Sequence, residues 1–317
     1  MRKEEIGGYF ELEEYTGRDY YNGLYHLNLA RTALVCLLEA LECKKILLPY
    51  FLCDSVISAI KKTGSDIRFY HISNDFCPKD DITLQDGEYM LIVNYYGQIS
   101  DEKLKFFRDK YKRVIVDNTH AYFQRPVKGI PTVYSCRKFF GLPDGAILSY
   151  DGKLKKIERD RSNMRMSHIL GRFEDGASPH YSEMLDTAES FYDSAPLEMS
   201  RLTENLLKGI DYDAVRERRN ANYKRLSEQL GKYNKAGFVS PDGPFCYPLW
   251  TDGGIAIRRE LAKKKIYVPT YWNNVINEMP KDSVEYDMAA NILALPCDQR
   301  CTFDDIDAEI AEVIKLL

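Results

Sequence analysis

The fold is decided by the stretch Val133-Tyr134-Ser135-Cys136-Arg137-Lys138-Phe139-Phe140-Gly141-Leu142-Pro143-Asp144-Gly145, which sets a lysine among aromatic residues. Upstream of it, the apolar run Val114-Ile115-Val116-Asp117 ends in an aspartate. An aldehyde cofactor with a pyridine ring needs an amine that holds its aldehyde as a Schiff base and a carboxylate that keeps its ring nitrogen protonated. We therefore predict that Lys138 and Asp117 form the catalytic pair of a pyridoxal 5'-phosphate site.

Each residue of this pair also has a structural interpretation. An aspartate at the end of a buried strand often caps or turns the chain that follows, and Asp117 with Asn118 and Thr119 suits that role. A lysine among aromatic residues, such as Lys138, can lay its stem on apolar surface and keep its ammonium in water. The functional interpretation therefore depends on the order of elements along the whole chain.

The composition is that of a globular protein. A chain of 317 residues exceeds the usual size of a single core, so two lobes are expected. Its 44 basic and 48 acidic residues are dispersed and give a formal net charge of −4, which argues against a nucleic-acid partner. The sequence shows neither an apolar signal core nor a membrane-length apolar stretch, so we expect a soluble, cytoplasmic protein without a membrane partner.

The cysteine pattern predicts no metal site. Eight cysteines lie scattered within apolar patterns, and none has the paired C-x-x-C spacing of a zinc or redox site. Cys297 and Cys301 are the closest pair, but they flank a predicted loop with no histidine nearby in sequence. We expect all eight thiols to be reduced.

The first half of the chain alternates short β-rich runs with helical patterns. Helices are predicted over 30–41, through Val56 and Ile60, and over 101–111, and strands over 45–48, 67–72, 89–94, 114–117, 132–134 and 146–150. This alternation is typical of a mainly parallel sheet covered on both faces, with ligands at the carboxyl ends of the strands. Asn94 and Asp117 lie at two such ends.

The second half predicts a connecting region and a smaller lobe. Residues 151–195 are polar and show little periodicity. Beyond them we expect a charged helix over 215–230, strands over 247–250 and 266–268, and an amphipathic helix over 303–317. The predicted division is an N-terminal arm over 1–25, a large cofactor-binding domain with its connecting region over 26–195, and a small domain over 196–317.

The order of these residues resembles the fold type I pyridoxal phosphate enzymes, and within them the DegT/DnrJ/EryC1/StrS aminotransferases, best known for aminating nucleotide-linked keto sugars. The resemblance covers most of the chain and rests on the segments 46–72, 94–97, 116–121, 138–146 and 292–296. It implies an α/β protein with the aspartate aminotransferase-like fold: a large domain with a mainly parallel sheet, and a smaller α+β C-terminal domain.

The resemblance also implies a cofactor site. Asp117 would pair with the pyridine nitrogen, and His120 would hydrogen-bond the ring hydroxyl oxygen. The helix that starts near residue 30 would direct its free backbone amides at the phosphate, because a helix N-terminus is a preformed anion site. Arg31 would add charge and Thr32 a hydroxyl, although Thr32 alone would be only a capping residue. The predicted cofactor-binding residues are Ala30, Arg31, Thr32, Cys53, Asp117, His120, Ser135 and Lys138.

Three positions depart from the pattern of the family. Cys53 stands where the family often has an aromatic residue that stacks on the cofactor ring. Ser135 lies three residues before the lysine, whereas many members place their phosphate-binding serine five before it. Met199 replaces an asparagine that the family presents to a neighbouring subunit's phosphate, so Ser200 or Arg201 is a candidate for that contact.

The preferred hypothesis is an aminotransferase that moves an amino group from an amino acid donor to a carbonyl acceptor, and the resemblance favours a nucleotide-linked keto sugar as acceptor. Lys138 would hold the cofactor and then move a proton, which requires a lowered pKa. The alternatives are a non-catalytic binding or regulatory protein that keeps the fold, another fold type I reaction, and a Schiff-base lyase without cofactor. A related dehydratase replaces this lysine, so Lys138 argues against it.

Substrate-binding residues are less well marked in the sequence. The aromatic and amide cluster over 267–273 suits a hydroxylated ligand, although core packing with a turn explains it equally. We predict Tyr96, Tyr271 and Trp272 as substrate-binding residues. The resemblance, rather than any residue pattern, implies a homodimer whose active sites are shared between subunits.

Overall fold

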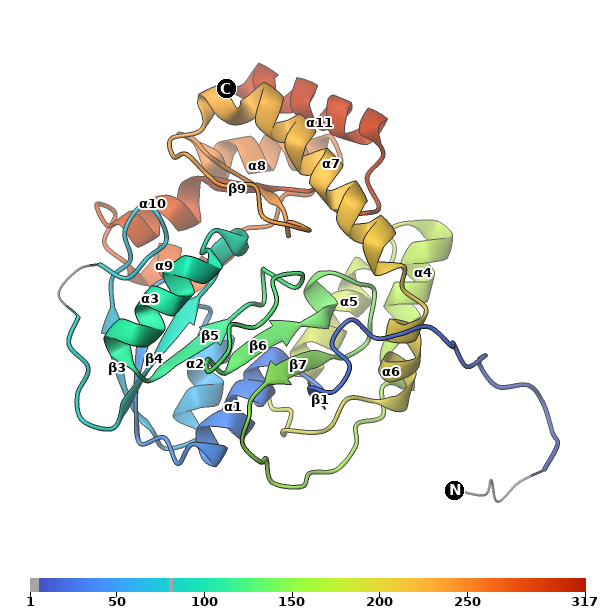
Figure 1. Cartoon of the computed structure of the whole chain (residues 1–317). Coiled ribbons are helices and arrows are strands. Elements are labelled where there is room, and N and C mark those ends of the chain that lie inside the picture. Colours follow the sequence, from blue (N-terminus) through green and yellow to red (C-terminus); the bar gives the residue numbers. More distant parts are fainter. Residues whose placement is uncertain (1–5, 80–81) are drawn as a thin grey trace.

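A seven-stranded sheet forms the centre of the computed structural model, which describes residues 6–79 and 82–317 (Figure 1). The strands are β1 (Tyr25–Leu27), β2 (Lys45–Pro49), β3 (Asp66–Tyr70), β4 (Glu88–Val93), β5 (Val114–Asp117), β6 (Thr132–Ser135) and β7 (Ala146–Ser149). Their order is β1-β7-β6-β5-β4-β2-β3. All neighbours from β6 to β3 pair in parallel, whereas β7 is antiparallel to both β1 and β6. The predicted mainly parallel sheet is confirmed.

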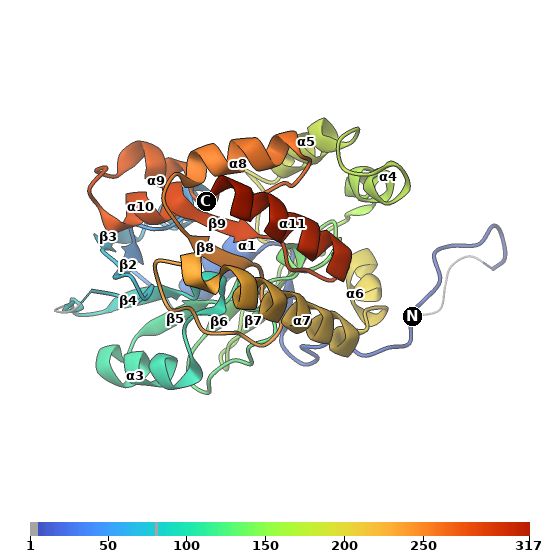
Figure 2. The same cartoon turned by 90° about the horizontal axis from the view of Figure 1, so that it is seen from above.

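Helices cover both faces of this sheet. They include α1 (Ala30–Ala40), α2 (Asp54–Lys61) and α3 (Asp101–Tyr111). The chain passes from β2 through α2 toward one edge and from β4 through α3 in the opposite direction, so right-handed crossovers place α2 and α3 on opposite faces. α1 packs against β6, β7 and α2, while α3 packs on β5 (Figure 2). The central strand β5 is buried along its whole length because both of its faces are covered.

A smaller lobe lies at the carboxyl ends of the parallel strands (Figure 1). Its antiparallel strands β8 (Tyr247–Trp250) and β9 (Ile292–Leu295) pack with α7 (Tyr212–Leu230), α8 (Gly254–Lys263) and α11 (Phe303–Leu316). These elements share a second hydrophobic cluster, distinct from the large core under the seven-stranded sheet. The predicted helices over 215–230 and 303–317 and the strand over 247–250 are confirmed. The division of the chain at residue 195 stays a prediction.

The predicted strand over 266–268 is wrong. The Ile266 amide donates to the Leu261 carbonyl and closes the end of α8, and Lys265 takes a left-handed φ of 61°. The chain then continues without a strand partner, because β9 fills the position beside β8. Val268 is still buried in the second cluster, so its apolar character reflects packing and not strand pairing.

The connecting region contains helices that the sequence analysis missed. These are the short η3 (Asn163–Arg165), α4 (Ser167–Asp175) and α5 (Tyr181–Ser190). Neither α4 nor α5 contains a buried residue, although both have an amphipathic pattern that the sequence analysis overlooked within this polar region. The remaining helical elements are η1 (Tyr95–Gly97), η2 (Cys136–Lys138), α6 (Arg201–Lys208), η4 (Gly231–Tyr233), α9 (Asn273–Glu278) and α10 (Val284–Asn291).

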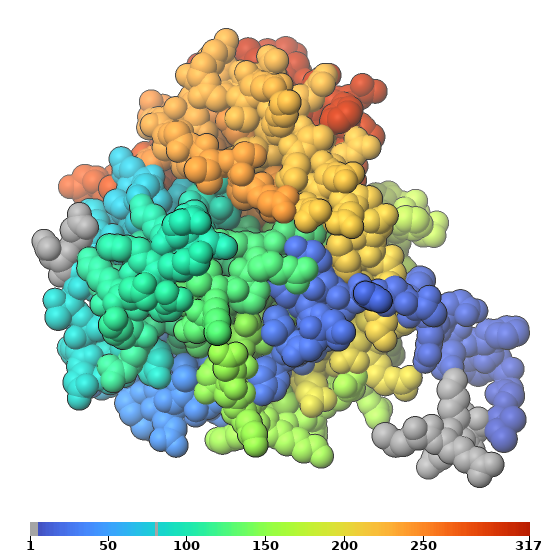
Figure 3. Space-filling model, viewed as in Figure 1, coloured from blue at the N-terminus to red at the C-terminus, as the bar shows by residue number. Residues whose placement is uncertain are grey.

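The N-terminal arm runs outward along α6 and leaves the body of the molecule (Figure 3). The Tyr15 amide donates to Asn205 Oδ1 at 2.9 Å, and Asn205 Nδ2 donates to the Glu13 carbonyl at 2.8 Å. Ahead of this anchor, Tyr9 and Phe10 are almost fully exposed. In the part of the chain that the structure describes, no helix is long and apolar enough to cross a membrane.

A buried arginine joins the two lobes. Arg219 of α7 is 2% exposed, and its guanidinium donates to the Pro244 carbonyl at 2.8 Å, to Gln299 Oε1 at 2.8 Å and to the Phe139 carbonyl at 3.1 Å. Phe139 follows Lys138 directly, so Arg219 ties the smaller lobe to the lysine loop.

Replacing Arg219 with methionine should lower the free energy of unfolding by about 3 kcal/mol, because several buried carbonyl oxygens lose their donors. Urea unfolding measures this change. Arg218→Met on the same helix is the matched control, since Arg218 is exposed, and it should change stability by no more than about 0.5 kcal/mol. Equal losses in the two variants would contradict the linking role of Arg219.

Candidate functional site

Lys138 and Asp117 meet at one edge of the sheet. β5 ends at Asp117, and β6, its parallel neighbour, leads into η2, which ends at Lys138. The two side chains form no direct ion pair in the described structure, but each acts on the pKa of the other. The fold therefore brings the predicted pair close enough for each charge to affect the other, without direct contact between the ammonium and the carboxylate.

Asp117 is buried, and Thr119 is its hydrogen-bond partner. Oδ1 accepts a hydrogen bond from the Thr119 amide at 2.8 Å, so the residue also serves the turn that the sequence suggested. The Thr119 side chain also acts on this carboxylate. Burial raises the pKa of Asp117, and the Thr119 hydrogen bonds and the charge of Lys138 oppose that rise. A cationic group beside Asp117 would lower its pKa again and favour the charged carboxylate.

Lys138 is exposed to solvent but lies against aromatic rings. Its Nζ is 4.8 Å from the ring centroid of Tyr271 and 5.9 Å from that of Phe245. The surrounding protein atoms desolvate the ammonium and lower the pKa of Lys138, and Arg137 lowers it further. The thiol of Cys53 and the carboxylate of Asp117 act in the opposite direction. A lysine that solvent reaches and whose pKa is lowered can act as a nucleophile and as a base.

His120 lies beside the pair with one ring nitrogen unsatisfied. Its ring stacks on Phe245, with centroids 4.1 Å apart and an angle of 14° between the planes. Nδ1 is buried and has no hydrogen-bond partner in the described structure. Burial, followed by the charge of Lys138, lowers the pKa of His120, so its ring is neutral at neutral pH. A neutral imidazole with a free nitrogen is suited to hydrogen-bond a ligand.

The three predicted substrate residues gather around this histidine. The ring centroid of His120 is 5.6 Å from that of Tyr96, 5.3 Å from that of Tyr271 and 5.6 Å from that of Trp272. Tyr96 is buried and has a left-handed φ of 54°. Tyr271 and Trp272 follow α8 in the chain and pack against the large core, so segments far apart in the sequence assemble the site. Their contact with a substrate stays a prediction.

The N-terminus of α1 has the geometry of an anion site. No side chain caps this helix, so the amides of Ala30, Arg31 and Thr32 face outward without a side-chain acceptor. The Thr32 hydroxyl lies 2.6 Å from Asn28 Oδ1 and 2.9 Å from the Leu29 carbonyl, so it is engaged within the chain. The interpretation of Thr32 as a capping residue is wrong, because the helix begins at Ala30 and the Thr32 hydroxyl donates to Asn28 Oδ1 and the Leu29 carbonyl. The backbone amides remain for a ligand.

Cys53 and Ser135 lie near the same edge. Cys53 is the N-cap residue of α2, with its Sγ 3.3 Å from Ser55 Oγ, and its charge would act on both Lys138 and Arg31. Ser135 is buried at the end of β6, and its hydroxyl makes no hydrogen bond within the described residues. Cys53 itself therefore supplies no aromatic ring that could stack on a cofactor.

Two neighbours of Lys138 were missed from the sequence. Phe245 stacks on His120 and faces Lys138, but nothing in the segment before β8 marks it as a site residue. Arg137 precedes the lysine and lowers its pKa, and its signal was only its position in the quoted stretch. A search of the sequence for basic residues next to the lysine would have found Arg137.

The structure places Ser200, a candidate for the contact to a neighbouring subunit, inside its own chain, so that contact stays a prediction. Met199 is fully buried in the large core, and Ser200 caps α6 while its Oγ donates to Asp144 Oδ1 at 2.7 Å. Both side chains are therefore turned inward. Arg201 is exposed and stays available on the surface.

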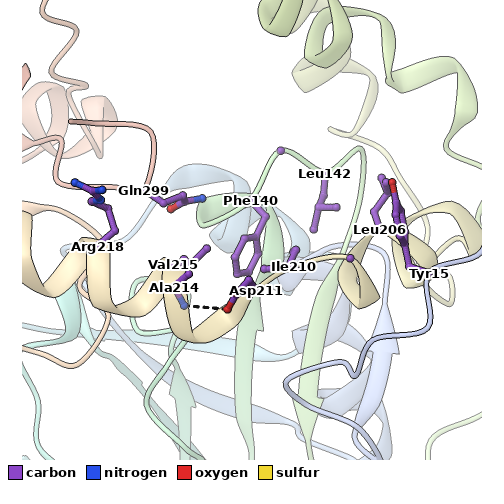
Figure 4. A pocket seen from close by; sticks show the side chains of 12 residues that line it. Tyr15, Phe140, Leu142, Leu206, Ile210, Asp211, Ala214, Val215, Arg218 and Gln299 are labelled. Atoms are coloured by element: carbon purple, nitrogen blue, oxygen red, sulfur yellow. Dashed lines mark hydrogen bonds between the residues drawn. The ribbon is translucent and has the colours of Figure 1, made fainter.

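A pocket of about 630 Å³ lies where the segment after Lys138 meets α6 and the start of α7 (Figure 4). Arg218 and Gln299 stand at one end of it and Tyr15 and Leu206 at the other. Its lining contains no lysine, histidine or cysteine. We therefore place the chemistry at Lys138, and the pocket remains separate from that site.

Comparisons with known proteins establish the fold. No protein-family model matches the sequence. No curated protein matches it either. Solved structures do: the sugar aminotransferase CalS13 from Micromonospora echinospora has a TM-score of 0.63 at 15% identity, over 92% of this chain and 87% of that one. NtdA from Bacillus subtilis with bound cofactor PMP has a TM-score of 0.66 at 14% identity, over 94% of this chain and 73% of that one.

A DegT DnrJ EryC1 StrS aminotransferase from Brucella abortus has a TM-score of 0.62 at 12% identity, over 92% of this chain and 85% of that one. These likenesses span nearly the whole chain and include both lobes. The chain therefore has the aspartate aminotransferase-like fold of the fold type I pyridoxal phosphate enzymes, as predicted. At such low identities the likeness concerns the fold, and activity must be argued from the site.

Because its pKa is lowered, Lys138 should react with an acylating reagent at lower pH than an ordinary lysine side chain, whose pKa is about 10.4. Competitive labelling with mass spectrometry across pH measures the midpoint, with the exposed Lys153 as the internal reference. Asp117→Asn removes a charge that raises the pKa of Lys138, so it should move the midpoint lower still. A Lys138 midpoint equal to that of Lys153 would sink this account of the site.

Proposed function

We propose that this protein is a pyridoxal 5'-phosphate-dependent aminotransferase of the DegT/DnrJ/EryC1/StrS type, which moves an amino group from an amino acid donor to a carbonyl acceptor. One observation carries the proposal: the fold brings Lys138, Asp117 and the uncapped start of α1 to the same edge of the sheet. This is the set of groups that an aldehyde cofactor with a pyridine ring and a phosphate requires.

The residues present fit this cofactor. Asp117 is a buried carboxyl group that feels the charge of Lys138, and its position suits a partner for a protonated ring nitrogen. His120 Nδ1 is buried and unsatisfied, as a partner for a ring hydroxyl must be before the ligand arrives. The amides at the start of α1 face a phosphate position. Cys53 offers no aromatic ring to stack on the cofactor, and Phe245 is already stacked on His120. The pyridine ring of the cofactor would therefore be less enclosed than in family members that have an aromatic residue at the position of Cys53.

When bound, the cofactor supplies an electron sink that stabilises a carbanion at the donor's α-carbon. Lys138 Nζ would hold the aldehyde and, once released, carry a proton between carbon atoms. Its lowered pKa keeps more of the amine in the neutral form that both tasks need. Asp117 would hold the ring nitrogen in its protonated form, and the aromatic rings around His120 would exclude water from the reacting atoms.

The identity of the carbonyl acceptor is inferred from the aromatic residues beside Lys138 and from the proteins with the same fold. Tyr96, Tyr271 and Trp272 form an aromatic wall next to Lys138, which suits a ring-shaped hydroxylated ligand. CalS13, which has this fold, is described as a sugar aminotransferase, which supports a keto sugar, in line with the nucleotide-linked keto sugar expected from the sequence. We place the enzyme in the cytoplasm, as the sequence led us to expect.

Spectral titration with pyridoxal 5'-phosphate tests the cofactor role. We expect a visible absorbance band from a covalent adduct that borohydride fixes on Lys138, as peptide mass spectrometry can show. The band should be absent in Lys138→Ala and unchanged in Lys153→Ala, the exposed control. Addition of glutamate should bleach the band, and Asp117→Asn should slow this bleaching by at least about 100-fold because the electrostatic support of the ring nitrogen is lost.

Each other outcome of the titration decides between the alternatives. An adduct on Lys138 that no amino acid bleaches would support the non-catalytic binding protein. Bleaching without transfer to any carbonyl compound would support another fold type I reaction. The absence of a Lys138-dependent adduct would contradict the proposal.

We also propose a homodimer with shared active sites. Exposed apolar side chains concentrate on α4, α5 and the neighbouring segments, where helices without any buried residue need a further surface to cover them. They include Met164, Leu170, Phe173, Tyr181 and Leu185. A second exposed apolar segment lies in the N-terminal arm, which extends away from the rest of the chain (Figure 3). It contains Ile6, Tyr9 and Phe10.

Light scattering after size-exclusion chromatography should give twice the mass of one chain for the wild type. Phe173→Asp should shift the protein toward the monomer, because it places a charge in the apolar surface of α4. Phe106→Asp on α3, where the ring is also exposed, is the matched control and should leave the mass unchanged. A monomeric wild type, or equal effects of both variants, would contradict the dimer.

A further inference from the structure

Three arginine side chains converge on Phe191, near the N-terminus of α1. Arg31 Nη2 donates to the Phe191 carbonyl at 2.6 Å. The guanidinium carbons of Arg137 and Arg165 lie 4.5 and 4.9 Å from the centroid of its ring. The three cations come from α1, from the lysine loop and from the segment before α4, so only the fold brings them together.

These charges are poorly compensated. Arg165 pairs with Asp160, with 2.6 Å between Nη2 and Oδ2, but its Nε is buried without a hydrogen-bond partner. Over residues 6–79 and 82–317, neither Arg31 nor Arg137 forms an ion pair with a carboxylate, and the guanidinium of Arg137 makes no hydrogen bond. The cluster thus has one carboxylate for three cations.

Two further carboxylates act on the cluster, Asp54 on Arg31 and Asp144 on Arg137, and Asp144 is already occupied. Asp144 acts on the pKa of Arg137, but its oxygens accept hydrogen bonds from the Ser200 amide and from the hydroxyls of Ser200 and Thr203. Burial is the main cause that lowers the pKa of Arg137 to about 10, and the charges of Arg31 and Arg165 lower it further. Holding like charges this close is unfavourable unless an anion lies among them.

Other buried arginines of the chain show that this arrangement is unusual. Arg219 and Arg258 are at least as well buried, yet their guanidinium groups are satisfied by carbonyl oxygens. Those acceptors are Phe139, Pro244 and Phe245 for Arg219, and Ala289, Ala290 and Ile292 for Arg258. The free donors of Arg137 are therefore a property of this cluster and call for an acceptor from outside the chain.

We propose that Arg31, Arg137 and Arg165 form a binding site for a phosphate dianion. Guanidinium groups match phosphate oxygens in pairs, and the uncapped amides of α1 lie beside Arg31. Two sources share this chemistry: the phosphate of the cofactor and a phosphate group of the acceptor substrate. The distinction between the two rests on the proposed function, whereas phosphate binding itself does not.

Calorimetric titration of the cofactor-free protein with inorganic phosphate tests the site. Arg137→Gln should weaken phosphate binding about tenfold or more, because it removes charge-assisted hydrogen bonds. Arg137→Lys should recover part of the affinity, since it keeps the charge but loses the paired donors. The matched control is Arg161→Gln, an exposed arginine of the same segment, which should bind phosphate as the wild type does.

Loading the protein with cofactor separates the two sources. If the cofactor supplies the phosphate, saturation with pyridoxal 5'-phosphate abolishes binding of inorganic phosphate, and Arg137→Gln weakens pyridoxal 5'-phosphate more than pyridoxal. If the substrate supplies it, the loaded protein still binds inorganic phosphate in a manner that Arg137 controls.

The proposal is overturned if the cofactor-free protein does not bind phosphate, or if Arg137→Gln weakens binding no more than Arg161→Gln. Circular dichroism checks that Arg137→Gln is folded, and Arg165→Gln repeats the test if it is not. Lys138→Ala should still bind inorganic phosphate. A failure of the lysine chemistry would therefore leave this measurement unaffected, so the two proposals fail independently.

Discussion

The parallel pairing of β4, β5 and β6 is the constraint on which the rest of the structure depends. The backbone N–H of Asn94 donates to the Asp117 carbonyl at 3.0 Å, and the backbone N–H of Asn118 donates to the Val133 carbonyl at 2.8 Å. These bonds align the carboxyl ends of three strands, so Asp117 and the lysine loop reach the same edge although a long connection separates them. The smaller lobe then closes over this edge, and Arg219 fixes it to the Phe139 carbonyl.

Burial at this edge creates an environment that favours neutral groups. It raises the pKa of Asp117 and lowers the pKa values of Lys138 and His120, so all three shifts favour the uncharged form. A bound group with a cationic ring nitrogen and an anionic phosphate would supply the missing counter-charges. The arginines around Phe191 have the same need for an anion, and Arg31 of this cluster lies in the first turn of α1.

The sequence predicted what depends on short-range pattern and on chain order. The alternation of short apolar runs with helical patterns predicted the sheet, and the order of these elements along the chain gave weight to the lysine–aspartate pair. It did not predict α4 and α5, because their short amphipathic patterns lie in a polar region and were overlooked. Residues 266–268 were mistaken for a strand because a buried Val268 has the same local signature as a strand residue. Phe245 and the arginine cluster depend on contacts between distant segments, which no local pattern encodes.

A crystal structure of the protein grown with pyridoxal 5'-phosphate tests the central claim most directly. The account predicts continuous density from Lys138 Nζ to the cofactor, a ring nitrogen within hydrogen-bond distance of Asp117 Oδ2, and a ring hydroxyl oxygen facing His120 Nδ1. Density for the cofactor at another place, or a ring whose nitrogen faces away from Asp117, would contradict it.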